Sequence, residues 1–186
     1  MISMSYLDEF LCNGKNQTQS NIIDIVREIT GIEFDQSHPM RSFYTMPAST
    51  KFHGCFQGGL AIHSLRVYYC ARLLAQAFGY QEEDIDANAC IFHDLVKTDS
   101  YKWDAFTSTY RYNYDTVSLP HGSESVLRMH KYNIPISSKG WELAIAYHMG
   151  AFEHDNMSAY SNACDKYKEV LLLHTADMMA TKIYKQ

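Results

Sequence analysis

Five predicted helices each carry or begin with a histidine or an aspartate, and this pattern constrains the fold more than any other feature of the chain. The segments are GLAIHSLRV with His63, CIFHDLVK with His93 and Asp94, LPHGSES with His121, AIAYHMG with His148, and LLLHTADMM with Asp177. An unpaired carboxylate is costly to bury, so an aspartate on an apolar helix must be protonated, paired or bound to a cation. We therefore expect the apolar helix faces to pack around one interior cleft where these side chains meet.

Helical patterns dominate the chain. Residues 20–31 show the clearest one, because Ser20 is expected as the N-cap, apolar residues recur with a helical period, and Gly31 ends the segment. Hydrophobic periodicity predicts further helices at about 59–78, 83–97, 121–132, 137–150 and from about 159 onward.

Residues 100–120 break the helical pattern. Tyr110, Tyr112 and Tyr114 alternate with polar residues, which is the period of a strand and predicts a small hairpin or an irregular loop. Aromatic residues there, Trp103 among them, either stack on a nucleobase or pack on the helices, and the sequence leaves both open. The predicted fold class is all-α, a bundle of about six or seven helices with one tyrosine-rich insertion.

The length of 186 residues fits one domain over 1–186. Its motif-bearing core is expected at about 50–182, with 1–49 as a helical extension packed on it. No apolar run approaches the roughly 20 residues that span a bilayer, and Asp8 and Glu9 argue against a secretory signal. The cysteines are scattered and form no Cys-x-x-Cys pair, which is typical of buried thiols in a reducing compartment. We expect a cytoplasmic protein without membrane contact.

The formal net charge of −5 bears on the partners. Binding to long nucleic acid uses many lysine and arginine contacts to phosphates, and no basic run is present. A small phosphorylated ligand held at one local site fits this charge better than a polymer held along a stripe. Whether the chain forms a homo-oligomer stays open.

The residue types of the six histidines and aspartates named above indicate a class of metal. Imidazole nitrogens together with carboxylate oxygens suit Mn, Fe, Co or Ni in six-coordinate sites that retain water, more than Mg or Zn. No cysteine joins the set, which argues against a structural zinc site. For His121 the alternative is a residue that merely opens a helix, and for His148 it is a core histidine with satisfied hydrogen bonds.

The ordered pattern of His63, His93-Asp94 and Asp177 resembles that of the HD-domain metal-dependent phosphohydrolases over about residues 50–182. The stretch HGCFQGGLAIHS is also similar to the HD domains attached to certain bacterial 3′-5′ exoribonucleases. Two positions depart from the family pattern. Val96 stands where the family often has glycine, and Met149 stands where some two-metal relatives have a second histidine.

This resemblance implies a helical HD fold and one or two divalent metal ions. His63, His93, Asp94 and Asp177 would bind the first ion. Asp94 would bridge to a second ion, which His121 and His148 would complete. Two neighbouring ions can hold a shared water, lower its pKa and neutralise phosphoryl oxygens, so a phosphate ester would be cleaved by metal-bound hydroxide.

Cations for the phosphate are expected beside these ligands. Lys97 follows Asp94 by three positions and Arg66 follows His63 by three, a spacing that shares a helix face. Lys97 is predicted, with Asp94, to take part in catalysis, and Arg66 to bind substrate. His53 in the preceding loop is a further candidate for a substrate contact. Surface ion pairs for the two cations, and an incidental loop position for His53, are the alternatives.

The predicted function is hydrolysis of a phosphate ester of a nucleotide or a small cyclic or oligonucleotide. One alternative is an exoribonuclease-like phosphodiesterase acting on short single strands. Another is a metal-stabilised binding or regulatory module without turnover. His174, one turn before Asp177, is expected either to support the site or to pack in the core. His38, His130 and His154 are expected at the surface.

Overall fold

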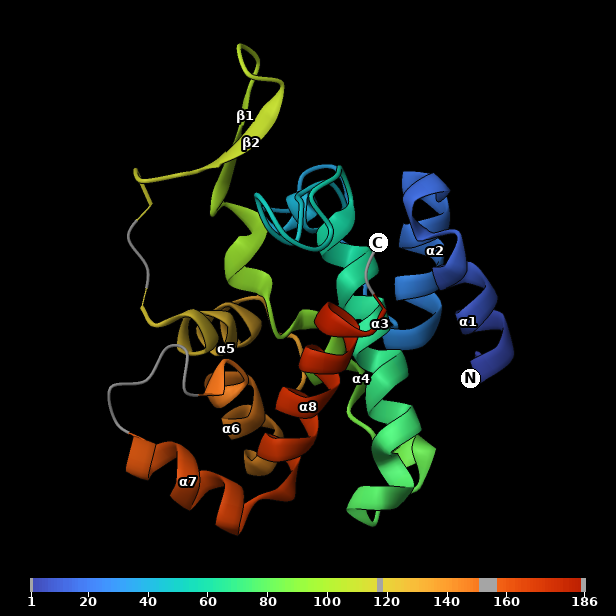
Figure 1. Ribbon diagram of the computed structural model, residues 1–186, viewed down its shortest axis with the longest axis vertical. Helices are drawn as coiled ribbons and strands as arrows, with labels where there is room; N and C mark the ends of the chain where they lie inside the picture. The colour runs from blue at the N-terminus through green and yellow to red at the C-terminus, as the bar shows by residue number, and fades with distance from the viewer. Residues whose placement is uncertain (1, 117–118, 151–156, 185–186) are drawn as a thin grey trace.

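A computed structural model describes residues 2–116, 119–150 and 157–184, and within them the fold is mostly helical (Figure 1). The α-helices are α1 (Met4–Cys12), α2 (Gln19–Thr30), α3 (Gly59–Leu74), α4 (Ala87–Phe92), α5 (His121–Lys131), α6 (Lys139–Tyr147), α7 (Met157–Lys166) and α8 (Lys168–Lys182). The short 3₁₀ helices are η1 (Gly14–Asn16), η2 (Arg41–Tyr44), η3 (Ala75–Phe78), η4 (Glu82–Asp84) and η5 (Leu95–Thr98). The strands are β1 (Tyr101–Asp104) and β2 (Thr109–Tyr112). The predicted helical fold class is confirmed.

Helix α3 is the centre of the bundle. Its sequence, GLAIHSLRVYYCARLL, is apolar on nearly every side, and most of its residues are buried. A helix with that pattern belongs in the interior. It packs against α8, α4 and α1, and Figure 1 shows it running through the middle of the molecule. His63 on α3 therefore lies inside the bundle, where α4 and α8 meet it.

The remaining helices cover this centre from two sides. Helices α5 and α6 pack on each other and α6 packs on α8, while α1 and α2 lie along the opposite side of α3 (Figure 1). Helix α2 begins at Thr18, whose side chain accepts a hydrogen bond from the Asn21 amide, rather than at the expected cap Ser20. None of the described helices has both the length and the apolarity that a membrane crossing requires.

Two predicted helices are interrupted. The segment expected at 83–97 stops at Phe92, because the backbone at Asp94 (φ −107°, ψ 24°) leaves the helical conformation before η5 begins. The segment expected from 159 is broken at Tyr167 (φ −135°, ψ 103°), which separates the mostly exposed α7 from α8. After this break, the fully buried Val170, Leu172 and Leu173 turn toward the core. The break at Tyr167 and the extra helix α1 account for eight α-helices among the described residues instead of six or seven, whereas the break after Phe92 adds only the 3₁₀ helix η5.

The predicted hairpin is confirmed. Strands β1 and β2 pair antiparallel in the register Tyr101↔Tyr112, Lys102↔Arg111, Trp103↔Tyr110 and Asp104↔Thr109. It is a two-stranded sheet, and Figure 1 shows it standing clear of the helical body. The chain thus leaves η5, which contains Lys97, and passes directly into this projecting hairpin.

Gly122 permits the closest approach between α5 and α6. A Cβ at this position would lie 2.3 Å from the carbonyl oxygen of Ile145 and 2.5 Å from that of Ala146. Both atoms belong to the backbone, so a side chain could be fitted only by moving α6. Since His121 precedes Gly122 and His148 ends α6, this contact sets the separation of two candidate ligands.

Gly122→Ala is accordingly expected to destabilise the fold by about 1–3 kcal/mol through overpacking, lowering the Tm by roughly 5 °C. Thermal unfolding followed by circular dichroism measures this change. Gly140→Ala is the matched control, because the atoms nearest to a Cβ there belong to the movable carboxylate end of Glu169. Equal Tm values for the two variants would contradict a backbone-limited contact at Gly122.

Candidate metal centre

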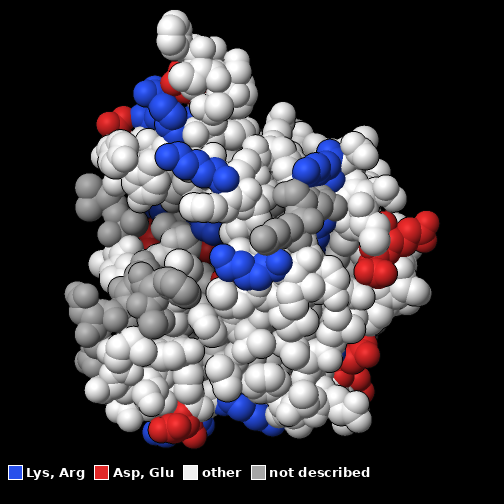
Figure 2. All heavy atoms as spheres, viewed as in Figure 1, with Lys and Arg blue, Asp and Glu red and all other residues white. Residues whose placement is uncertain are grey.

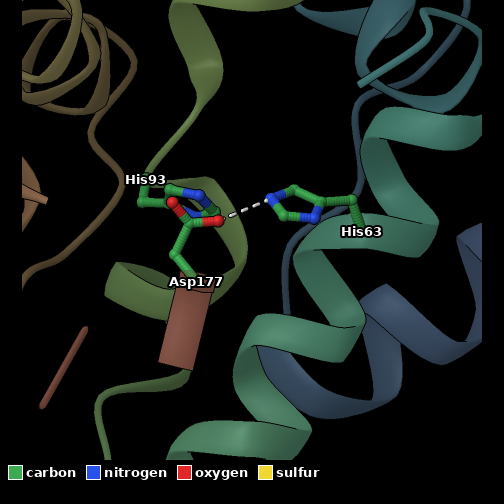
Figure 3. Close-up of side chains that lie close together, drawn as sticks. All are labelled: His63, His93 and Asp177. Atoms are coloured by element: carbon green, nitrogen blue, oxygen red, sulfur yellow. Dashed lines mark ion pairs between the residues drawn. The ribbon is translucent and has the colours of Figure 1, made fainter. Parts of the chain in front are cut away.

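Six side chains from five helical segments meet in the interior. His63 extends from α3 and Asp177 from α8, and Figure 3 shows them pointing toward each other with His93 alongside. His93 and His148 are the C-cap residues of α4 and α6, Asp94 follows His93, and His121 is the first residue of α5. The side chains of His93, Asp94 and His148 are at most 2 % exposed. The structure therefore brings the predicted ligand set together.

Asp94 lies between two groups of imidazoles. Its Oδ2 is 3.4 Å from Nε2 of His93 and 3.9 Å from Nε2 of His63. Its Oδ1 is 3.4 Å from Nε2 of His148 and also contacts Nε2 of His121. Each carboxylate oxygen thus faces its own pair of histidines, which is the arrangement that a bridging ligand needs.

Charges around the two carboxylates keep them ionised. Burial alone would raise the pKa of Asp94, but the Lys97 ammonium, with His93 and His121, holds it well below its usual range. Burial would also raise the pKa of Asp177, and the His63 imidazole, whose Nε2 lies 3.1 Å from Oδ1 of Asp177, lowers it instead. Two buried anions among imidazoles form a site with affinity for cations.

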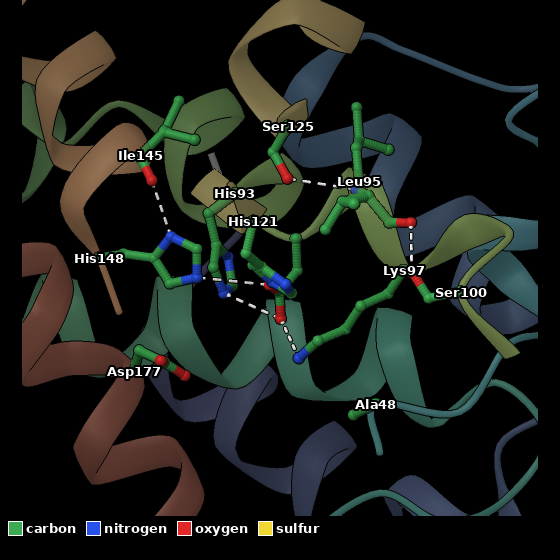
Figure 4. A network of polar contacts seen from close by, with 12 residues as sticks. Ala48, His93, Leu95, Lys97, Ser100, His121, Ser125, Ile145, His148 and Asp177 are labelled. Carbon is green, nitrogen blue, oxygen red and sulfur yellow. Dashed lines mark hydrogen bonds and ion pairs between the residues drawn. The ribbon is translucent and has the colours of Figure 1, made fainter. Parts of the chain in front are cut away.

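Backbone carbonyls fix the orientation of two imidazoles. Nδ1 of His93 lies 2.8 Å from the Cys90 carbonyl oxygen. Nδ1 of His148 lies 2.7 Å from the carbonyl oxygen of Ile145 (Figure 4). A carbonyl oxygen only accepts, so each Nδ1 must donate, and in the neutral imidazole each Nε2 then presents a lone pair to the cluster. Support of this kind is usual behind metal-binding histidines.

The donor atoms fit a divalent cation. Nε2 of His63, of His93 and of His148 is buried without a hydrogen-bond partner among the described residues, and such orphaned polar atoms are rare in interiors. Burial lowers the pKa of His63 and of His121, which favours the neutral form that binds metal. Two overlapping groups each keep their ligand atoms within 4.8 Å of one another, namely His63, His93 and Asp177, and His93, Asp94 and His148.

A family model for the HD domain matches residues 60–181, which is most of the chain and spans the cluster from His63 to Asp177. The chain belongs to the HD-domain family. HD domains are a family of metal-dependent phosphohydrolases, and the described residues of this chain include His/Asp groups that could hold a metal ion.

A curated relative of this HD domain is the 3′-5′ exoribonuclease YhaM of Bacillus subtilis (strain 168). The two sequences are 27% identical over 141 residues, which are 76% of this chain and 44% of that protein. The chain therefore spans less than half the length of that relative. No solved structure matches the present chain.

Lys97 lies at the border between the cluster and a hollow. Its Nζ is 2.6 Å from Oδ2 of Asp94, and its side chain is 13 % exposed. Burial alone would lower the pKa of Lys97, but the Asp94 carboxylate raises it, so the ammonium stays charged. The hollow has a volume of about 350 Å³, and its lining includes Lys97, Asp177 and Lys182. Figure 2 shows lysine and arginine side chains around a depression on this face.

His53 also reaches this region. Its ring lies 4.7 Å from the ring of His63 between centroids, and it lines the same hollow as Lys97. Burial, together with the neighbouring His63, lowers the pKa of His53 to about 4. A neutral imidazole thus lies beside His63 and borders the same hollow as Lys97.

Arg66 is not brought to the cluster. Its Nη2 donates a hydrogen bond to the Leu11 carbonyl oxygen at 2.9 Å, and the side chain lines a separate hollow with Asp8 and Tyr69. Three residues turn a helix by about 300°, and a long side chain can extend to either side of that position. The guanidinium joins α3 to α1, and it therefore takes no part in the function proposed below.

Ser125 is a supporting residue that the sequence pattern did not single out. It is fully buried, and its Oγ accepts a hydrogen bond from the Val96 amide at 3.2 Å (Figure 4). It lies one helical turn after His121, so the signal available in the sequence was a polar residue four positions after a candidate ligand. Val96 is itself buried at this contact.

The other histidines divide between support and surface. His174 donates from Nδ1 to the His148 carbonyl oxygen at 2.6 Å, so it supports the backbone of a ligand. His130 is exposed and pairs with Glu142, whereas His38 is half-buried and stacks on Phe34 with centroids 4.6 Å apart. His38 is therefore only partly exposed, and one face of its ring is covered by Phe34. His154 lies outside the described residues.

Proposed function

We propose that this HD domain hydrolyses a phosphate ester of a nucleotide or a short oligonucleotide, using one or two divalent metal ions. One observation carries the proposal. The two oxygens of Asp94 face two separate histidine pairs, and the Lys97 ammonium extends from the same carboxylate to a hollow large enough for a ligand.

The described residues suggest a division of roles. His63, His93, Asp94 and Asp177 are proposed to hold the first ion, while His121 and His148 hold a second that shares Asp94. Mn, Fe, Co or Ni suits this donor set better than Mg or Zn. When bound, such ions polarise the phosphoryl group and lower the pKa of water.

The residues around these ligands position the ester. Lys97 binds a phosphoryl oxygen from the open side of the cluster, since its ammonium is charged and partly accessible. His53 stays uncharged at neutral pH, so it can donate or accept one hydrogen bond to the substrate without adding charge. The walls of the hollow include the apolar Phe52, Met149 and Met178, which limit access of bulk water.

A second candidate is an exoribonuclease-like phosphodiesterase on short single strands. The resemblance to YhaM, named as a 3′-5′ exoribonuclease, supports it. The exposed aromatic residues of the hairpin beside the cluster support it as well. The two candidates share the same metal chemistry and differ in the length of the substrate.

A substrate screen tests the proposal. Metal-free protein would be reloaded with Mn, Fe, Co or Ni and assayed on bis(p-nitrophenyl) phosphate, p-nitrophenyl phosphate, cyclic nucleotides, dinucleotides and six-nucleotide RNA. Metal-dependent release of product from at least one class is expected. Tight binding of a nucleotide without any turnover across the panel would instead favour a binding module.

Lys97→Met is expected to lower kcat/KM by about 10- to 100-fold, because it removes one charged hydrogen bond to the phosphoryl group. Steady-state kinetics measures this change. Lys182→Met is the matched control, since Lys182 also lines the hollow but is exposed. If both variants lost the same activity, Lys97 would be assigned only to neutralising Asp94.

A further inference from the structure

The hairpin carries an aromatic face. Antiparallel pairing places Tyr101 opposite Tyr112 and Trp103 opposite Tyr110. Because alternate residues of a strand share a side, all four rings lie on one face, and Lys102, Arg111 and Thr109 lie on the other. Ring centroids are 6.2 Å apart in the first pair and 5.1 Å in the second. We call these four residues the aromatic face.

Two of the four rings on this face are exposed, while Tyr101 and Tyr110 are partly buried. Trp103 is 57% exposed and Tyr112 is 49% exposed. An isolated two-stranded hairpin is marginal in water, so leaving such rings uncovered adds no stability. Exposed aromatic area of this kind marks a binding surface.

The aromatic face continues into the metal centre. β1 begins three residues after η5, which carries Lys97. The hydroxyl of Tyr101 donates to the Ala48 carbonyl oxygen at 3.5 Å, and Figure 4 shows Ala48 beside the Lys97 side chain. The base of the hairpin is therefore held next to the residue proposed to bind phosphate.

A hollow of about 590 Å³ lies beneath the outer part of this face, and a ligand site commonly has this size. Its lining includes Trp103, Tyr110, Phe56 and Gln57. The same loop supplies Phe52 and His53 to the hollow at the cluster. One continuous loop therefore borders both hollows.

We propose that the aromatic face stacks the bases of a short single strand while a phosphodiester of that strand lies at the metal centre, an inference that rests on the proposed function. Stacking on tyrosine and tryptophan suits nucleic-acid bases of any sequence. It also requires few phosphate contacts, which agrees with a chain of net charge −5. The exposed cations Lys102 and Arg111 on the opposite face are paired with Asp115 and Asp104, so stacking is the main interaction that the hairpin offers.

The fluorescence of Trp103 tests this directly on the unmodified chain. The other tryptophan, Trp141, is 2% exposed, so a strand that binds the hairpin changes mainly the Trp103 emission. Titration would use six-nucleotide oligoadenylate and an abasic strand of equal length, with chelator present to keep both intact. Quenching by oligoadenylate alone supports the inference. Equal quenching by both strands, or none, overturns it.

Variants of the hairpin give the matched comparison. Trp103→Ala is expected to weaken oligoadenylate binding roughly 5- to 100-fold in fluorescence anisotropy of a labelled strand. Trp103→Phe should keep the affinity within a few fold while losing the tryptophan signal. Phe106→Ala at the fully exposed turn should bind as the unmodified chain does. A loss of affinity in this control equal to that of Trp103→Ala overturns the assignment to the aromatic face.

Hydrolysis of bis(p-nitrophenyl) phosphate by the metal-loaded chain separates this inference from the proposed function. Hydrolysis without quenching refutes the aromatic face alone. Quenching without any hydrolysis supports the aromatic face as a strand-binding surface and refutes the catalytic proposal. A dimer in sedimentation that Trp103→Ala dissociates, without quenching, would assign the face to a second copy of the chain and overturn the inference.

Discussion

Asp94→Asn is expected to lower kcat/KM for phosphodiester hydrolysis by roughly 10³-fold or more. The asparagine keeps the shape of the side chain but has one oxygen in place of two. In the structure, both oxygens of Asp94 are used, one toward His63 and His93 and the other toward His121 and His148. Polarisation of a phosphoryl group by bound metal is worth several kcal/mol, and each 1.4 kcal/mol is about tenfold in rate. Steady-state assays with added Mn²⁺ measure the loss.

Asp99→Asn is the control for this substitution. It also removes one carboxylate, five positions later, from an exposed side chain that pairs with Arg128 at 3.1 Å. Its activity should stay close to that of the unmodified chain, and far-UV circular dichroism should show both variants folded. An Asp94→Asn variant that is folded and keeps activity within tenfold of Asp99→Asn would contradict the central role of Asp94.

The membership of the cluster could be anticipated from the sequence because buried polar groups need partners. The helix that carries His63 is apolar on nearly every side, so it must lie in the interior. An interior aspartate such as Asp94 must then find cations or hydrogen-bond donors. These two requirements hold whatever the details of the backbone. The convergence of the six side chains therefore followed from burial and order along the chain.

The positions of long cations and of helix breaks could not be anticipated in the same way. Arg66 and Lys97 have the same spacing from a ligand, yet Lys97 contacts Asp94 and Arg66 contacts the Leu11 carbonyl oxygen. Their different directions depend on which neighbouring element offers an acceptor, and that is tertiary information. The break at Tyr167 likewise leaves the apolar periodicity intact, since only the packing of α8 shows where the backbone must turn.

The end of α4 illustrates why such breaks matter for function. A continuous helix through Asp94 would have used the Cys90 carbonyl oxygen within its own hydrogen-bond ladder. Because α4 stops at Phe92, that carbonyl accepts from Nδ1 of His93 instead. The interruption that periodicity missed is thus the feature that aims Nε2 of His93 at the cluster. His148 repeats the arrangement at the end of α6 with the Ile145 carbonyl oxygen.

Metal binding is expected to raise the Tm by about 5–10 °C at a free Mn²⁺ concentration of 100 Kd. A ligand that binds only the folded state stabilises it by about 2.7 kcal/mol at that concentration. For a chain of this size, each kcal/mol shifts the Tm by roughly 2–4 °C. The structural reason is that the buried Nε2 atoms of His63, His93 and His148 gain a partner that the described residues do not supply. Differential scanning fluorimetry with and without chelator measures the shift.

Single substitutions should show how much of this rise in Tm comes from each of two ions. Asp177→Asn removes the carboxylate that faces His63, whereas His121→Asn alters only the group around Oδ1 of Asp94. Metal analysis is therefore expected to give two ions per chain for the unmodified protein and one for His121→Asn, with part of the Tm rise retained.

His130→Asn is the control for these substitutions. Its imidazole is exposed and pairs with Glu142, which is not one of the candidate ligands. An unshifted Tm with each of Mn, Fe, Co and Ni would contradict the metal centre. A single ion in the unmodified protein that His121→Asn leaves in place would reduce it to one site, with Asp94 as a terminal ligand.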